Sequence, residues 1–192
     1  MTLHTPKYLA VGEGDSHWIT QARLTVKFRS GDTGGAYSLI ELTAPKGMGI
    51  APHIHTSEDE VFIVVNGSFR VFCDGEPFEL TQGDSVFLPR GLSHWFEVTS
   101  DDFRAVEIVN PGGFENMLTD LGELGERPYD PRTLTPSDFA HALDVTRRHG
   151  HVILPSAPGF TGHGIEGAEL PGTAHSPVVA HPAHAGAGGK PT

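Results

Sequence analysis

The chain is poor in cysteine, in basic residues and in long apolar runs. Its single cysteine, Cys73, cannot form an internal disulfide, which is compatible with a reducing compartment. It stands in the apolar run FRVFC and is expected in the core. Only 13 Lys and Arg oppose 24 Asp and Glu, so the formal net charge is -11. Because nucleic acids and anionic membrane surfaces bind basic patches, neither is expected as a partner.

No apolar run approaches the ~20 residues that a membrane-spanning helix needs. The first residues, MTLHTPKYLAVGEGD, lack the basic and apolar regions of a signal peptide. We therefore expect a cytoplasmic protein without a membrane partner. A length of 192 residues suits one domain with a sizeable core and a tail.

Short strand-like runs fill residues 24–110. They are rich in Val, Ile, Phe and Leu and are separated by turn signals, a pattern typical of a β-sandwich or barrel. Asn66-Gly67 and Asp74-Gly75 predict tight type I′ turns, because both pairs tolerate positive φ angles. The strands that flank the first of these turns are expected to be antiparallel neighbours.

Three histidines and one glutamate form a candidate metal site. His53 and His55 are two residues apart, so on a strand their imidazoles point to the same face. Glu60 has the wrong parity for that strand, and the polar segment 56–59 must turn to bring it back. A lone histidine such as His94 is more often solvated or hydrogen-bonded than a ligand, and a His-Xaa-His pair is ambiguous. Their combination with a glutamate predicts a metal site.

The spacing of these residues resembles the two sequence motifs of the cupin family. The first motif is matched by Gly47, five residues, His53-Ile54-His55, four residues, Glu60, six residues and Gly67. The second is matched by Gly83, five residues, Pro89-Arg90-Gly91, two residues and His94. Val98 stands where the family usually has Asn, a position that is not a metal ligand. The resemblance implies that His53, His55, Glu60 and His94 hold one divalent transition metal per subunit.

Flanking segments extend the resemblance to residues 34–150. The segments GGAYSLIELTAP, NPGGFENMLTDLGE and RRHG are similar to those of bacterial single-domain cupins related to quercetin 2,3-dioxygenase. The resemblance implies an all-β fold, the double-stranded β-helix or jelly-roll barrel of cupins. It implies less about quercetin itself, because the same ligand set serves many reactions in the family.

We expect four segments along the chain. They are an N-terminal arm or strand (1–23), the cupin barrel (24–110), a helical C-terminal extension (111–154) and a disordered tail rich in Gly, Pro, Ala and His (155–192). The spacing of the tail histidines fits neither a strand nor a helix, so they are not expected to be ligands. These are His163, His175, His181 and His184.

Two helices are expected in the C-terminal extension. The first has an apolar stripe at Phe114, Met117, Leu118 and Leu121. The second is capped by Thr135 and ended by Gly150. Either these helices form a lid whose Phe114 or Met117 touches a substrate, or their stripes only close the open end of the barrel.

The expected substrate pocket is apolar and aromatic. Strand parity places Phe62 and Val64 on the face of Glu60, and Phe96 and Val98 on the face of His94. Together with Phe114 and Met117, they are the candidate pocket residues. Arg90 is expected in a turn at the barrel rim, where a surface salt bridge is its more typical role.

The other face of the strand after Glu60 is also apolar. Val61, Ile63 and Val65 share this face, which needs a cover. We expect the N-terminal segment or a second subunit to provide it, and a homodimer is the prediction.

A site of three histidines and one glutamate suits iron, nickel, cobalt, manganese, copper or zinc. Such a site and pocket suit a phenolic, flavonol-like or enolisable, polyketide-like small molecule. The resemblance implies a dioxygenase that uses O₂, in which Glu60 is a metal ligand and also the general base. Thiol dioxygenases of the family generally lack the glutamate, which argues against a thiol substrate. The alternatives are a non-redox cyclase or isomerase and a small-molecule-binding module without catalysis.

Overall fold

The computed structural model describes residues 5–154, and of Pro131 only the backbone. Within this range the chain is mostly β-structure, with two α-helices near its C-terminal end. The elements are β1 (Asp15–Ile19), β2 (Ala22–Phe28), β3 (Ser38–Thr43), β4 (Gly49–His55), β5 (Asp59–Asn66), β6 (Ser68–Cys73), β7 (Glu76–Thr81), β8 (Ser85–Leu88), β9 (Ser93–Val98), β10 (Arg104–Asn110), α1 (Phe114–Asp120), α2 (Pro136–Arg148) and β11 (His151–Ile153). Two short 3₁₀ turns, Gly122–Gly125 and Pro131–Thr133, connect the helices.

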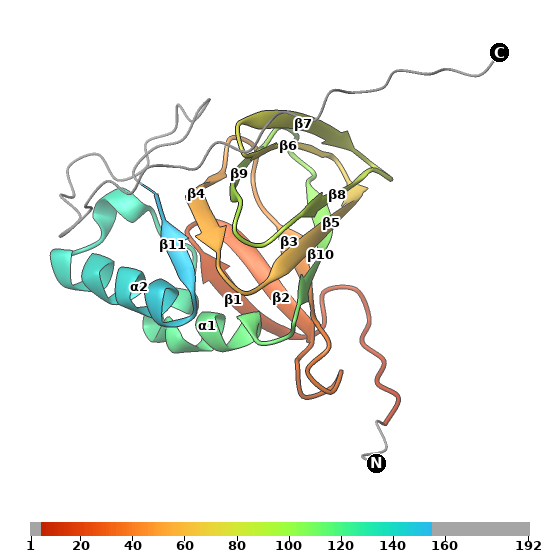
Figure 1. The fold of residues 1–192 in the computed structure, drawn as a ribbon, viewed down its shortest axis with the longest axis horizontal. Coiled ribbons are helices and arrows are strands. Elements are labelled where there is room, and N and C mark those ends of the chain that lie inside the picture. Colours follow the sequence, from red (N-terminus) through yellow and green to blue (C-terminus); the bar gives the residue numbers. More distant parts are fainter. Residues whose placement is uncertain (1–4, 155–192) are drawn as a thin grey trace.

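The strands form two antiparallel sheets that wrap around a common core (Figure 1). One sheet has the order β1-β2-β3-β10-β5-β8 and the other β11-β4-β9-β6-β7. Burial alternates along β3 and β6, since successive side chains point to opposite faces of a sheet. The inner faces supply the apolar core, and Cys73 lies in it as expected. This is the all-β cupin architecture that the sequence predicts.

One of the two predicted hairpins is present and the other is wrong. Asp74 and Gly75 both have positive φ and join β6 to β7, which pair directly. Asn66-Gly67 instead carries the chain from β5 in one sheet to β6 in the other. At Gly67, a Cβ atom would lie 2.2 Å from Ser100 Oγ and 2.9 Å from Phe103 Cα. The Asn-Gly signal therefore reflects a close backbone approach and a positive φ, not a hairpin.

The N-terminal strands belong to the barrel sheet. Strand β1 pairs with β2, so the sheet begins upstream of the predicted boundary at residue 24. These strands lie at the opposite edge of the six-stranded sheet from β5 and β8, so β1 does not cover the outer face of β5. On that outer face Ile63 is 39% exposed and Phe87 of β8 is 58% exposed. The homodimer stays a prediction, with this face as the surface that a second subunit would cover.

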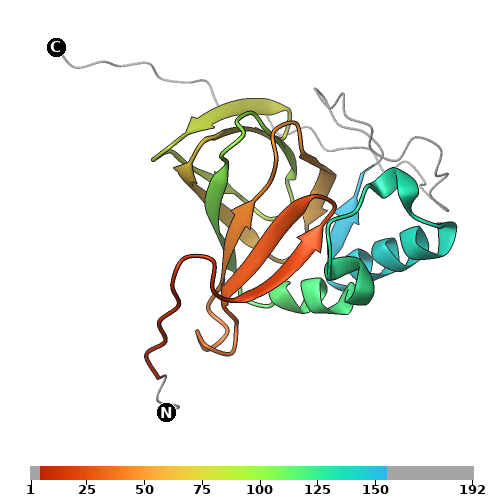
Figure 2. The same cartoon turned by 180° about the vertical axis from the view of Figure 1, so that it is seen from behind.

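The C-terminal extension contains the two expected helices and one additional strand. Thr135 and Asp138 form a capping box at the start of α2, and Gly150, at φ 81°, follows its end. The extension is not purely helical, because β11 pairs with β4 and so joins the five-stranded sheet. In Figures 1 and 2, α1 and α2 lie side by side against one side of the barrel, next to β11. No helix in residues 5–154 is both long enough and apolar enough to cross a bilayer. The predicted tail and its histidines lie outside the described residues.

A buried carboxylate anchors α1 to the barrel. Glu115 is 1% exposed and accepts hydrogen bonds from the Ser30 backbone N–H at 2.7 Å, the Ser30 hydroxyl at 2.6 Å and the Ser38 hydroxyl. Burial favours the protonated acid, but these donors outweigh it and lower the pKa of Glu115 below its ordinary value of 4.5. Glu115 thereby ties α1 to the β2–β3 connection and to β3.

We expect Glu115→Gln to destabilise the protein by about 1–3 kcal/mol at neutral pH, because charge-assisted hydrogen bonds are lost. A lowered folded-state pKa gives stability that is present above the unfolded pKa and is lost as pH falls through the folded pKa. The difference in the free energy of unfolding between the variant and the wild type should therefore become smaller below pH 4.5, the ordinary pKa of a glutamate. Urea unfolding from neutral to acidic pH measures this, with the exposed Glu123→Gln as control. A pH-independent difference would contradict the assignment.

Candidate metal centre

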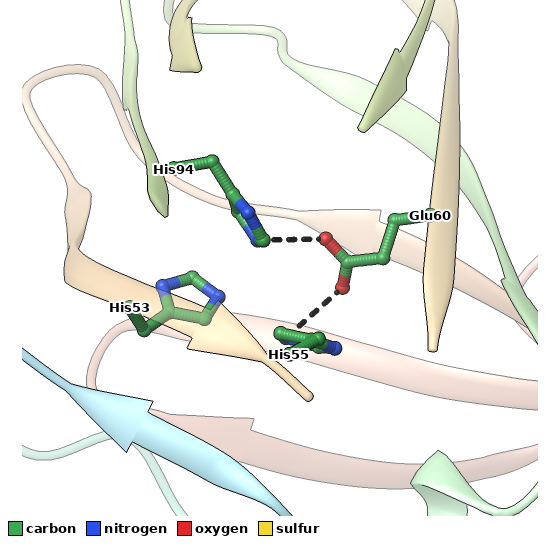
Figure 3. A group of neighbouring side chains, drawn as sticks. All are labelled: His53, His55, Glu60 and His94. Carbon is green, nitrogen blue, oxygen red and sulfur yellow. Dashed lines mark ion pairs between the residues drawn. The ribbon is translucent and has the colours of Figure 1, made fainter. Parts of the chain in front are cut away.

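Four predicted ligands converge between the two sheets. His53 and His55 project from β4, and His94 projects from the neighbouring β9, where it is paired with His53. Glu60 comes from β5 in the other sheet, after residues 56–58 have carried the chain across. One ligand atom from each of the four side chains lies within 4.8 Å of the other three (Figure 3). The cluster could therefore hold one metal ion.

Hydrogen bonds set the direction of each imidazole. The Nδ1 atom of His53 lies 2.8 Å from the Ala51 carbonyl oxygen, and that of His94 lies 3.1 Å from the Leu92 carbonyl oxygen. Carbonyl oxygens only accept hydrogen bonds, so both Nδ1 atoms carry the proton. In the neutral form of each ring, the Nε2 atom is thus left with a lone pair for another partner. His55 is held differently, by a carboxylate discussed below.

The arrangement around Glu60 fits a cation. His94 Nε2 lies 3.0 Å from Glu60 Oε2, and His55 Nε2 lies 3.4 Å from Glu60 Oε1 (Figure 3). A neutral His94 would place a lone pair against a carboxylate oxygen, which is favourable only with a proton or a metal cation between them. Two donors that each lie about 2.0–2.2 Å from one metal are separated by roughly 3–4.4 Å. The donor chemistry and the spacing therefore both suit a metal ion.

Burial and charge shape the protonation of the cluster. Burial lowers the pKa of His53 well below its ordinary value, and the neighbouring His94 and His55 lower it further. Burial also opposes ionisation of Glu60, but His55 and His94 outweigh it and lower the pKa of this carboxyl. A neutral imidazole and an ionised carboxylate are the forms that bind metals, so the environment favours ligation by His53 and Glu60. At His55, burial lowers the pKa but Glu60 and Glu58 outweigh it and raise the pKa, so a metal there would compete with a proton.

A second buried carboxyl, Glu107, lies beside Glu60 and was missed from the sequence. It projects inward from β10 and is 3% exposed. Burial, followed by the neighbouring Glu60 carboxylate, raises the pKa of Glu107 well above its ordinary value. The environment of the centre thus favours the ionised form of Glu60 and the neutral, protonated form of Glu107. The alternation of Ala105, Glu107 and Val109 in the run RAVEIVN is the signal that could have located it.

A cavity of about 100 Å³ opens beside the cluster. All four candidate ligands line it. Four of the six candidate pocket residues also line it, namely Phe62, Phe96, Phe114 and Met117. The helices therefore both close the barrel and form part of the cavity wall. Val64 and Val98 are buried in the core and do not line this cavity.

Val64 and Val98 do not reach the cavity because they lie at a different depth in the barrel. Each pair of residues along a strand advances about 6.6 Å, so side chains on one face do not all reach the same cavity. Phe69, fully buried, packs edge-on against Phe62 and Phe96 and fills the barrel below them. Val64 and Val98 lie two residues further along their strands than Phe62 and Phe96, and Val98 is paired with Phe69, level with the ring that fills the barrel there.

Two more residues near the site, His151 and Glu58, were not predicted. His151 of β11 is 4% exposed and lines the cavity, and its Nε2 lies 2.8 Å from Glu58 Oε2. The sequence gives no local signal for His151, since it lies 96 positions after its neighbour His55. Arg90 follows the prediction: it forms an exposed bidentate ion pair with Asp59.

Comparison with known proteins agrees with this geometry. The cupin domain family matches residues 40–109. The chain therefore contains a cupin domain, at residues 40–109. Two curated proteins to which the chain is similar are quercetin 2,3-dioxygenases. The Bacillus subtilis strain 168 enzyme is 27% identical over 144 residues, which cover 73% of this chain and 43% of that protein. The Aspergillus japonicus enzyme is 30% identical over 110 residues, which cover 52% of this chain and 31% of that protein.

The chain thus spans less than half the length of these two relatives. Among solved structures, KdgF from Halomonas sp. superposes with a TM-score of 0.52 at 19% identity. The match covers 57% of this chain and 99% of that one. At this identity the likeness concerns the fold.

Proposed function

We propose that the chain is a metal-dependent dioxygenase that acts on a phenolic or enolisable small molecule. The observation that carries the proposal is the cluster of three histidines and one glutamate at the wall of a largely apolar cavity. Four protein ligands leave open positions on a metal that prefers five or six. When bound, the metal would supply Lewis acidity and, if redox-active, electron exchange with O₂. The likeness to quercetin 2,3-dioxygenases supports the same reaction class.

The residues around the cavity have separate tasks in this proposal. Glu60 takes the proton from the substrate hydroxyl, since it is the ionised carboxylate of the site. Glu107, held as a neutral acid, donates a hydrogen bond toward Glu60 or toward a substrate oxygen. The rings of Phe62, Phe96 and Phe114 exclude water from the reacting atoms.

The size of the cavity narrows the substrate class. Pockets for drug-sized ligands begin at about 300 Å³, so a cavity of about 100 Å³ is too small for a flavonol. A short 1,3-diketone or a similarly small enol is the better match to the structure as it stands. A flavonol would require the cover formed by α1, α2 and β11 to move.

Oxygen consumption tests the proposal. Metal-depleted protein is loaded with Fe²⁺, Co²⁺, Ni²⁺ or Mn²⁺ and mixed with a short 1,3-diketone, a catechol or a flavonol. We expect O₂ uptake matched to substrate loss, with a higher kcat/KM for the diketone than for the flavonol. Metal-free protein is the control. Absence of O₂ uptake with every metal and substrate would contradict a dioxygenase, and binding without any turnover would indicate a binding module.

A second candidate function is a non-redox isomerase or cyclase for a similar substrate. The Glu60 and Glu107 pair favours it, because one carboxylate and one neutral acid are what proton transfer on an enolisable compound needs. Anaerobic incubation with the Zn²⁺ form separates the two candidates. Product formation without O₂ would support the isomerase.

A further inference from the structure

His55 differs from the other two histidines of the cluster in how its ring is held. The Nδ1 atoms of His53 and His94 lie against carbonyl oxygens two residues earlier in their own chain segments. The Nδ1 atom of His55 is buried and lies in ion-pair contact with Glu58 Oε2 at 3.2 Å, and within residues 5–154 it makes no hydrogen bond of standard geometry. Its orientation therefore depends on a side chain.

That side chain is itself held by β11. His151 Nε2 lies 2.8 Å from the same Glu58 oxygen, so Glu58 bridges two imidazoles. The rings of His55 and His151 stack with centroids 4.0 Å apart and planes at 20°. Phe114 of α1 lies beside both rings, with its centroid 6.0 Å from that of His55 and 5.6 Å from that of His151. All three polar groups are largely buried, which strengthens these contacts.

We propose that Glu58 and His151 are positioning residues for the metal centre. Glu58 accepts the Nδ1 proton of His55, which fixes the tautomer that turns the Nε2 lone pair toward the other ligands. His151 holds Glu58 in place and supports the His55 ring from one face. A carboxylate behind a metal-ligating histidine orients the ligand and increases its basicity. The inference rests on the metal site of the proposed function, but not on the reaction assigned to it.

A second metal bound by His55, Glu58 and His151 is the competing interpretation of this cluster, since their ligand atoms also lie within 4.8 Å of one another. His151 Nε2 makes a direct 2.8 Å hydrogen bond with Glu58, and His55 Nδ1 lies in ion-pair contact with the same oxygen at 3.2 Å. These two contacts partner the carboxylate without a cation. The positioning role therefore explains the geometry with one metal per chain.

Co²⁺ binding tests the proposal without any substrate. Affinity is measured by competition with a chelator, stoichiometry by metal analysis, and geometry by the visible absorption of Co²⁺. We expect Glu58→Gln to weaken Co²⁺ binding about 10–100-fold, to keep one Co²⁺ per chain and to change the spectrum. His151→Phe retains the stacked ring but removes the donor, and should weaken binding about tenfold. His151→Gln, which places an amide N–H near the position of Nε2, should restore affinity to within about threefold.

His149→Gln is the matched control. His149 lies two residues before His151 and forms a 2.9 Å contact with a carboxylate, Asp120, away from the cluster. It should leave Co²⁺ affinity and spectrum unchanged. Near-ultraviolet circular dichroism checks that each variant is folded.

Three results would overturn the proposal. Wild-type affinity in both Glu58→Gln and His151→Phe would show that neither residue positions a ligand. Two Co²⁺ per wild-type chain, with one lost in Glu58→Gln, would make these residues ligands of a second metal. Failure of the wild type to bind Co²⁺ would remove the centre on which the inference rests. Wild-type Co²⁺ binding with the expected losses but without any O₂ uptake would instead contradict only the dioxygenase.

Discussion

The His94→Ala variant is expected to lose stoichiometric metal binding. His94 is 3% exposed, comes from a different strand than the other two histidines, and presents Nε2 to Glu60 at 3.0 Å. Its removal leaves two histidines from β4 and one carboxylate, and opens the side of the cluster that faces β9. Metal analysis after dialysis should show about one divalent ion per wild-type chain and close to none in the variant.

Thermal unfolding gives an independent measure of the same loss. A ligand at 1,000 times its Kd stabilises the folded state by about 4 kcal/mol. For a domain of this size that is a rise in Tm of roughly 8–16 °C. The wild type should show this rise on metal addition, and His94→Ala should not. His141→Ala, an exposed residue of α2, is the control and should behave as the wild type. Full metal retention in His94→Ala would exclude His94 as a ligand.

Glu60→Gln is expected to impair turnover far more than metal binding. Glutamine has the same shape and keeps one oxygen ligand, but it cannot accept a proton from the substrate. Loss of a general base typically costs about 10²–10⁴-fold in rate. We expect a kcat at least about 100-fold lower, with most of the metal still bound at saturating concentration.

The control for this experiment is Glu97→Gln. Glu97 lies on β9 three residues from His94, is only partly buried and does not line the cavity. Its replacement should alter neither turnover nor metal content. Unchanged turnover in Glu60→Gln would exclude the role of Glu60 as general base. Loss of metal and turnover together would indicate that Glu60 acts only as a metal ligand.

Three candidate ligands, His53, His55 and Glu60, could be predicted because their positions follow from strand parity and short spacing, whereas His94 was assigned through the resemblance to the second cupin motif. Two histidines two residues apart must share a face, and a polar segment of four residues is enough to return Glu60 to them. The capping box of α2 is equally local, since it depends on Thr135 and Asp138 alone. These features need no knowledge of which strands pair.

The features that could not be predicted from the sequence depend on pairings between distant segments. The Asn66-Gly67 signal has the same local chemistry in a hairpin and in a crossing between sheets, and only the partners of β5 and β6 decide between them. Parity put Val64 and Val98 on the correct face but could not give the depth at which Phe69 fills the barrel. His151 reaches the cluster only because β11 pairs with β4, across about a hundred residues of chain.

The pairing of β11 with β4 also has a consequence for biosynthesis. The register places His151, Val152 and Ile153 opposite His55, Ile54 and His53, so the strand that bears two candidate ligands is completed by the last strand of the described chain. On the ribosome, β4 can pair with β9 as soon as that strand has emerged, but its other edge stays open until residues 151–153 follow. The open edge of β4 would expose unpaired backbone N–H and C=O groups, with which other chains can pair. A nascent or prematurely terminated chain would thus be exposed to aggregation and to metal capture by an incomplete site, and the final residues of the fold protect it from both.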